Sequence, residues 1–293
     1  MTQAAVAAAP PAGPLAGLRR EAGRLRRDAP GYAGTALLLA AFAVPTLVAH
    51  GLDARTIDGV GVWAKPLKFQ LALGVYCLTL AFYARFVPRR VRDGRGWRAF
   101  TALVIAAVLI EAAWVAGAAF LGERAHYNFT HALLAPAYPV MGLLATVLTA
   151  ATAQYAWAMH RHTHLSPAAL KGGLVLGLGL TLPLTLATAF YLSAGAGHHV
   201  VAGVAEGVIR GSGGVDAGGL ALFGWSRGDG DLRVAHFFAT HALHGVPLLA
   251  LALASLGWKG RGAARAAALA WTSLVGFAFV EALAGYPFLG GLG

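Results

Sequence analysis

The sequence predicts an all-α polytopic membrane protein with seven transmembrane helices, its N-terminus inside and its C-terminus outside. Hydrophobic residues fill 58% of the 293 positions and charged residues only 12%, whereas soluble domains carry about 25% charged residues. Mean hydropathy is +0.64. Seven stretches also reach the length of about 20 apolar residues that a helix needs to cross a bilayer.

The seven predicted spans are separated by short polar segments. They lie near 31–50, 66–87, 99–121, 133–158, 170–193, 233–257 and 264–288. The stretch 199–225 is rich in glycine and carries charges, so we interpret it as part of a Gly-rich outer loop near 195–232, or as a partly re-entrant segment. The chain therefore divides into a basic, Ala/Pro-rich cytoplasmic tail over 1–30 and a seven-helix membrane domain over 31–293.

The distribution of charge predicts the orientation. With the N-terminus inside, the inner segments carry 16 Lys and Arg against three acids, and the outer segments carry seven of each. Because Lys and Arg are retained on the cytoplasmic side, the net charge of +11 is a topology signal, and we expect a lipid bilayer and no nucleic acid as partner. Nineteen arginines against four lysines are typical of a GC-rich bacterial genome, so the inner (plasma) membrane is the expected location.

Two alternatives remain open for the basic segment over 15–27. Its pattern is compatible with an amphipathic helix that lies on the anionic leaflet. A disordered positive tail accounts for the same residues.

Ionisable side chains inside the spans predict a functional site. At 1.5 Å per residue, His236, His241 and His244 lie at increasing depth from the outer end of the 233–257 span, and Glu111 and Glu281 lie in the outer halves of two other spans. Ionisable groups that face lipid are costly, so we expect these five side chains to converge as metal ligands in one outward-facing cavity. A histidine that merely bonds a neighbouring helix is the alternative reading for each imidazole.

Cations at the outer ends of the spans run against the positive-inside bias. Lys65 and Lys68 start one span, and Arg124 and Arg233 flank the same side. Together they predict a site for an anion or a lipid headgroup, since helix N-termini and ammonium groups both attract anions. Simple anchoring at the headgroups is the alternative.

Further polar residues are expected around the outer mouth of the cavity. Asp231 either caps the 233–257 helix or pairs with Arg233. The outer-mouth residues are His50, His126, Asn128, His131 and Asp231.

Two short stretches resemble sequences in multi-span bacterial membrane proteins. They are W-x-K-P-x-K-F, from Trp63 to Phe69, and G-D-L-R-x-x-H-F, from Gly230 to Phe237. No activity is attached to that resemblance, so it implies no residue roles.

Several function classes are disfavoured. All four lysines lie at or near span ends, which argues against a retinal Schiff base, and no P-loop pattern is present, which argues against ATP-driven transport by this chain alone. The single cysteine, Cys77, excludes a disulfide within the chain and a cysteine-based metal cluster.

Three hypotheses of function remain. The first is a His/Glu-lined cavity that binds a metal ion or haem for redox or hydrolytic chemistry. The second is a proton-coupled transporter of a small anionic solute, because His and Glu at mid-depth are typical of proton relays. The third is a structural subunit in which Gly173-x-x-x-Gly177 packs against a partner helix to form an oligomer. The sequence does not decide whether the chain is an enzyme.

Overall fold

The predicted all-α polytopic fold is confirmed. The computed structural model describes residues 13–57, 59–126, 128, 130–197, 209–210, 224–226, 228 and 230–289. Its long helices are α2 (Pro30–Leu52), α3 (Ala64–Tyr83), α5 (Arg95–Leu121), α6 (Leu134–His162), α7 (Ala168–Gly197) and α10 (Gly260–Leu283). The shorter ones are α1 (Pro14–Asp28), the 3₁₀ turn η1 (Ala84–Phe86), α4 (Arg89–Arg92), α8 (Leu232–Thr240) and α9 (Ala242–Ser255).

Four two-residue strands accompany the helices in the part of the chain that the structure describes. β1 (Thr56–Ile57) pairs antiparallel with β2 (Val60–Gly61), and β3 (Ile209–Arg210) pairs parallel with β4 (Gly230–Asp231). Most of the predicted Gly-rich loop near 195–232 lies outside the described residues.

Within the described residues, six helices are long and apolar enough to cross a bilayer, and one further stretch is so only as a bent pair of helices. The six are α2, α3 with η1, α5, α6, α7 and α10, and α8 and α9 pass the same test only as a pair bent by 65°. The structure therefore differs from the continuous helix that we expected over 233–257. The other six predicted spans each coincide with one helix, within a few residues at the ends.

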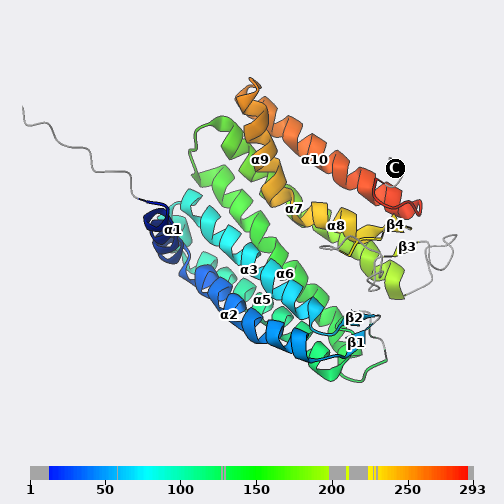
Figure 1. Cartoon of the computed structure of the whole chain (residues 1–293). Coiled ribbons are helices and arrows are strands. Elements are labelled where there is room, and N and C mark those ends of the chain that lie inside the picture. Colours follow the sequence, from blue (N-terminus) through cyan, green and yellow to red (C-terminus); the bar gives the residue numbers. More distant parts are fainter. Residues whose placement is uncertain are drawn as a thin grey trace, which may run out of the picture.

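The crossings alternate in direction, so the connections gather at two ends of the molecule (Figure 1). We call one the α1 end, which holds α1 and the loops that follow η1 and α9. The other is the strand end, which holds β1 to β4 and the end of α10. α2, α3, α5 and α6 pack together as a first helix group, and α7, α8, α9 and α10 as a second, with α6 packed along α7 where the two groups meet.

Local sequence explains where several helices begin and end. Pro30 starts α2, where its missing N–H costs nothing. Gly122 ends α5 with φ 74°, a left-handed conformation that glycine adopts without strain. The Glu123 N–H then bonds back to the Ala118 carbonyl, which turns the next loop over the end of α5.

The core lies between the helices, and large apolar side chains also cover the outer surface. Tyr32, Leu80, Tyr155, Met159 and Leu178 are among the fully buried residues of the main core cluster. Exposed apolar side chains lie along α2, α6, α9 and α10, among them Leu37, Phe42, Val44, Leu143, Leu248, Leu269, Phe277 and Val280. In water this surface would be an aggregation liability, whereas in a bilayer it faces lipid.

Candidate functional site

The broken crossing brings the three predicted histidines to one place. α8 enters from the strand end and stops at Thr240, His241 takes a non-helical conformation, and α9 starts at Ala242. The nine residues of α8 correspond to about 14 Å along the helix axis, which is about half the thickness of a hydrocarbon core. Backbone that leaves the helix inside a bilayer needs partners from other helices.

A tryptophan supplies one of these partners. The Trp271 indole N–H, on α10, donates to the Phe238 carbonyl at 2.8 Å, on the side of the break that belongs to α8. The indole lies across α9 at Gly245, where a Cβ atom would come 2.1 Å from the ring. Gly245 is therefore required for the close approach of Trp271.

A tyrosine supplies the second partner. Pro247 has no N–H, so the Leu243 carbonyl, four residues earlier in α9, lacks its helical donor. The Tyr83 hydroxyl, at the end of α3, donates to that carbonyl at 2.8 Å. Both Tyr83 and Leu243 are buried.

Each histidine is held by an oxygen whose chemistry fixes the proton on one ring nitrogen. The Thr79 hydroxyl donates to the Val75 carbonyl, so it accepts from His244 Nε2 at 2.9 Å. The Thr188 hydroxyl likewise donates within α7 and accepts from His236 Nδ1 at 3.0 Å. With the threonine protons on these helix carbonyls, the bonded nitrogen of each imidazole is the N–H, and the other nitrogen keeps its lone pair.

His241 follows the same rule at the break itself. Its Nδ1 lies 2.7 Å from the Phe237 carbonyl, which can only accept, and its ring stacks on Phe237 with centroids 4.0 Å apart. The rings of His241 and His244 are 5.8 Å apart. Among the described residues the second nitrogen of each of the three imidazoles has no hydrogen-bond partner.

The glycine pattern of α7 packs inside the chain. A Cβ at Gly173 would lie 2.8 Å from the Pro247 Cα, and one at Gly177 would lie 2.7 Å from the Ala242 carbonyl oxygen. The two glycines therefore seat α9 against α7, and they do not form a free surface for a partner helix.

Asp231 and Arg233 form a clasp at the start of α8. Asp231 accepts from the Arg233 N–H as a helix cap and also pairs with the Arg233 guanidinium at 2.6 Å. Arg233 Nη2 further donates to the Gly224 carbonyl at 2.8 Å. Asp231 thus both caps α8 and pairs with Arg233, as the two alternatives predicted.

Glu111 lies in a second cluster, at the strand end of the first helix group. The Glu111 side chain is 5% exposed, and its Oε1 lies 3.4 Å from Nε2 of His126, in the loop after α5. The His126 ring contacts Phe69 and Tyr138. Burial lowers the pKa of His126, although Glu111 partly opposes this effect, so the imidazole is neutral at pH 7.

Two predicted anion-binding cations lie beside this Glu111–His126 cluster. Lys65 is exposed, sits 6.0 Å from the centre of the Phe69 ring, and interacts electrostatically with Glu111 and Arg124. Arg124 and Lys68 are exposed as well. The strand end of the first group thus presents three exposed cations, and one of them, Lys65, lies near the buried Glu111 carboxylate.

The other predicted outer-mouth residues organise the loops at the strand end. Asn128 donates to Glu123 at 2.7 Å and accepts from the His131 N–H. The Nδ1 atom of His131 accepts from the N–H groups of Leu133 and Leu134, where α6 begins, and the His50 ring lies next to Gly61 in β2.

The five predicted metal ligands do not form one site. Glu111 is on α5, which packs with α2, α3 and α6, whereas Glu281 is on α10, which packs with α7, α8 and α9. Within the described ranges, no group of three or more His, Cys, Asp or Glu side chains is placed to hold a metal ion. Glu281 is partly buried, and its Oε2 has no hydrogen-bond partner among the described residues.

Sequence reasoning missed the residues that surround the break. Thr79, Tyr83, Thr188 and Trp271 are ordinary residues of spanning helices, and nothing in their spacing marks them. Pro247 was the available signal, because a proline inside a span always leaves one carbonyl that needs a donor from elsewhere.

Comparison with known protein families, with curated proteins and with solved structures gave no match to this chain.

Proposed function

We propose that this chain is a carrier that moves a small anionic solute across the membrane together with protons. The observation that carries the proposal is the break at His241, where a spanning helix bends by 65° beside three imidazoles. In membrane carriers, discontinuous helices near mid-depth are a structural basis for solute and ion sites.

The start of α9 favours an anionic solute. The N-terminal end of α9 lies at the break and points toward the strand end, and no side chain of the described residues caps it. The first N–H groups of a helix and its dipole together attract negative charge. Exposed Lys65, Lys68 and Arg124 at the strand end would raise the local concentration of anions on the route inward.

The imidazoles supply the proton coupling. His236, His241 and His244 each donate one hydrogen bond, and the other ring nitrogen of each has no hydrogen-bond partner among the described residues. A positive charge gained at the break would strengthen the binding of an anion there, and loss of the proton would release it. The two steps link proton movement to solute movement.

We also propose that the strand end faces outside and the α1 end faces the cytoplasm. The α1 end carries the 16 cations that the sequence assigns to the inner side. The positive-inside rule supports this orientation.

Reconstitution tests the carrier directly. The purified protein is placed in liposomes that contain a pH-sensitive dye, and phosphate, sulfate and short carboxylates are added outside under an inward proton gradient. We expect at least one anion to accelerate proton entry over protein-free liposomes. His241→Gln and His244→Gln should abolish this acceleration, whereas His164→Gln, at an exposed position of the α1 end, should preserve it. Flux that is equal in all variants would contradict the proposal.

The metal or haem hypothesis stays a prediction, and the described residues offer no set of three side chains for a metal ion. Elemental analysis and an absorbance spectrum of the purified protein test it.

A further inference from the structure

A short basic helix crosses the cytoplasmic end of the bundle. α1 is followed directly by α2, with only Ala29 between them. Ala29 has φ −149° and ψ 70°, so the chain turns sharply between the two helices. In Figure 1 α1 is seen nearly end-on while the spanning helices are seen from the side, so α1 lies across the bundle and not along it. This is the direction of a helix that lies in a membrane interface.

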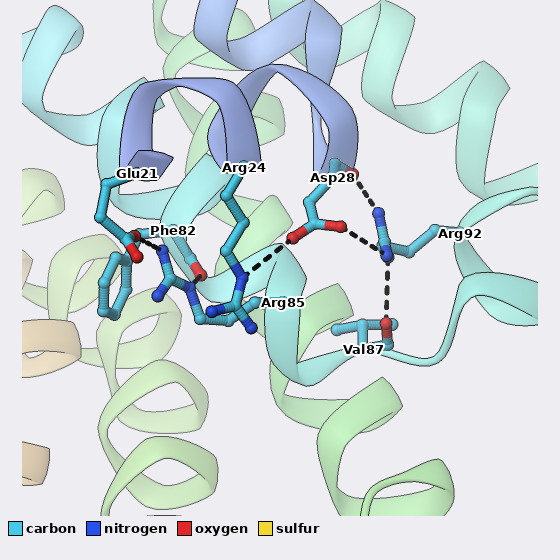
Figure 2. Close-up of polar contacts among 7 residues, drawn as sticks. All are labelled: Glu21, Arg24, Asp28, Phe82, Arg85, Val87 and Arg92. Carbon is cyan, nitrogen blue, oxygen red and sulfur yellow. Dashed lines mark hydrogen bonds and ion pairs between the residues drawn. The ribbon is translucent and has the colours of Figure 1, made fainter. Parts of the chain in front are cut away.

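Two ion pairs hold α1 in place, as Figure 2 shows. Glu21 pairs with Arg85 of η1 at 2.6 Å, and Asp28 pairs with Arg92 of α4 at 3.2 Å. Glu21 and Asp28 are seven residues apart and therefore share one face of α1. Leu25, on the same face, packs against the main core.

The two arginines that pair with α1, Arg85 and Arg92, are held in place by further contacts. The Arg85 guanidinium stacks on Phe82 at 3.8 Å, and its Nε donates to the Phe82 carbonyl. Arg92 Nε donates to the Val87 carbonyl at 3.0 Å, and the side chains of Arg85 and Arg92 are only 11% and 14% exposed. These contacts give α1 one defined orientation on the bundle.

The acidic side chains of α1 are paired with arginines, whereas most of its basic side chains are exposed. Both acids of α1 face arginines, and Arg24 also lies 3.7 Å from Asp28. The remaining arginines of α1 are exposed and make no ion pair within the described part of the chain; they are Arg19, Arg20, Arg26 and Arg27.

An apolar strip runs beside these arginines. Leu15, Leu18 and Ala22 are spaced three and four residues apart, so they form one strip, and the two leucines are 73% and 68% exposed. Arg19 and Arg26 lie one turn further along from Leu15 and Ala22. An exposed leucine strip bordered by arginines matches the boundary between acyl chains and headgroups, and it is unfavourable in water.

We propose that the outer face of α1 binds the phosphate groups of anionic phospholipids in the leaflet at the α1 end. Leu15 and Leu18 would enter the acyl region, and Arg19, Arg20, Arg26 and Arg27 would bond the headgroup phosphates. Guanidinium groups bind phosphate through paired N–H donors. The proposal is independent of transport, because it concerns the surface of α1, away from the break at His241, and needs no solute.

Lipid retention measures the binding. The protein is purified in a neutral detergent, and native mass spectrometry counts the phosphatidylglycerol and phosphatidylcholine molecules retained from an equimolar mixture. We expect a several-fold preference for phosphatidylglycerol that weakens with salt. The variant R19Q/R20Q/R26Q/R27Q should lose this preference. The control R161Q/K259Q/R261Q/R265Q removes the same charge from the same end of the molecule and should keep it.

A probe on α1 measures its position. Because the only cysteine, Cys77, is buried, Leu18→Cys introduces one accessible thiol for a polarity-sensitive dye. In bilayers that contain phosphatidylglycerol the dye should report an apolar surrounding, and the four-arginine variant should shift it toward water. Equal lipid retention in both quadruple variants, or a water-exposed dye in every bilayer, would overturn the proposal. Binding of double-stranded DNA in preference to lipid would overturn it too.

Discussion

The hydroxyl of Tyr83 donates a hydrogen bond to the carbonyl of Leu243, across 160 residues of sequence, at a distance of 2.8 Å. Pro247 removes the helical donor of that carbonyl, and Tyr83 replaces it. One hydrogen bond thus joins the end of α3 to the first turn of α9.

Tyr83→Phe should destabilise the protein, and the cost should depend on Pro247. Loss of the hydroxyl leaves a buried carbonyl without a donor, which costs about 1–2 kcal/mol. In a Pro247→Ala background the alanine N–H restores the helical bond, so Tyr83→Phe should cost much less there. The free energies of unfolding of the four proteins in mixed micelles give the coupling. Equal costs in both backgrounds would contradict this account, and Tyr286→Phe, at an exposed position, serves as the control.

Trp271→Phe should destabilise the break while keeping most of the ring volume. The Phe238 carbonyl loses its indole donor, and we expect a loss of about 1–3 kcal/mol. Denaturant unfolding of the purified protein measures it. Trp258→Phe, at a half-exposed tryptophan, should leave the midpoint unchanged, and an equal effect of the two substitutions would show that the hydrogen bond contributes nothing.

Gly245→Ala should destabilise the protein strongly, although it adds only one methyl group. The new Cβ would lie 2.1 Å from the Trp271 ring, so the indole must move away from Phe238, and overpacking of this kind costs about 1–3 kcal/mol. Gly276→Ala, in α10 with nothing within 4 Å, should be neutral or stabilising by up to about 1 kcal/mol. Thermal unfolding of both variants tests the contrast, which disappears if Trp271 does not lie over Gly245.

The stability of the protein should fall in acid partly through His126. Burial lowers the pKa of His126 below 6.5 in the folded protein, so the unfolded chain binds this proton more readily. The stabilising contribution is complete above pH 6.5 and is lost as the pH falls below that value. Glu111 and Lys65 face the same imidazole and act in opposite directions.

The measurement compares the wild type with His126→Gln from pH 7.5 to pH 5. The variant cannot titrate at this position, so its unfolding midpoint should fall less steeply with acid. If the unfolding midpoints of the two proteins fell equally with pH, His126 would have the same pKa in the folded and the unfolded chain.

Apolar length was enough to predict the helices but not which helices pack against one another. Spans of about 20 apolar residues appear in the sequence directly, and all seven predicted stretches correspond to helical segments. Their packing depends on small residues such as Gly173 and Gly177, which seat α9 against α7. Hydropathy carries no information on such pairs, so Glu111 and Glu281 were expected together although they lie in different helix groups.

Contacts between residues far apart in sequence limited the prediction of the site. The three histidines belong to α8, α9 and the residue between them, but the break there depends on donors in α3 and α10. Arg233 was expected to bind an anion, although Asp231 two residues earlier already neutralises it at the start of α8. His126 reaches Glu111 only because Gly122 turns the loop back over α5.

The two hydrogen bonds at the bend come from opposite sides of the molecule. Tyr83 belongs to the first helix group and Trp271 to the second, and they hold carbonyls on either side of His241. If the first helix group rotated against the second, the hydrogen bond of Tyr83 would lengthen, whereas Trp271 would move together with α8 and α9. The break therefore couples the two helix groups mechanically. A crosslink between α3 and α9 should hold the two groups in one relative orientation.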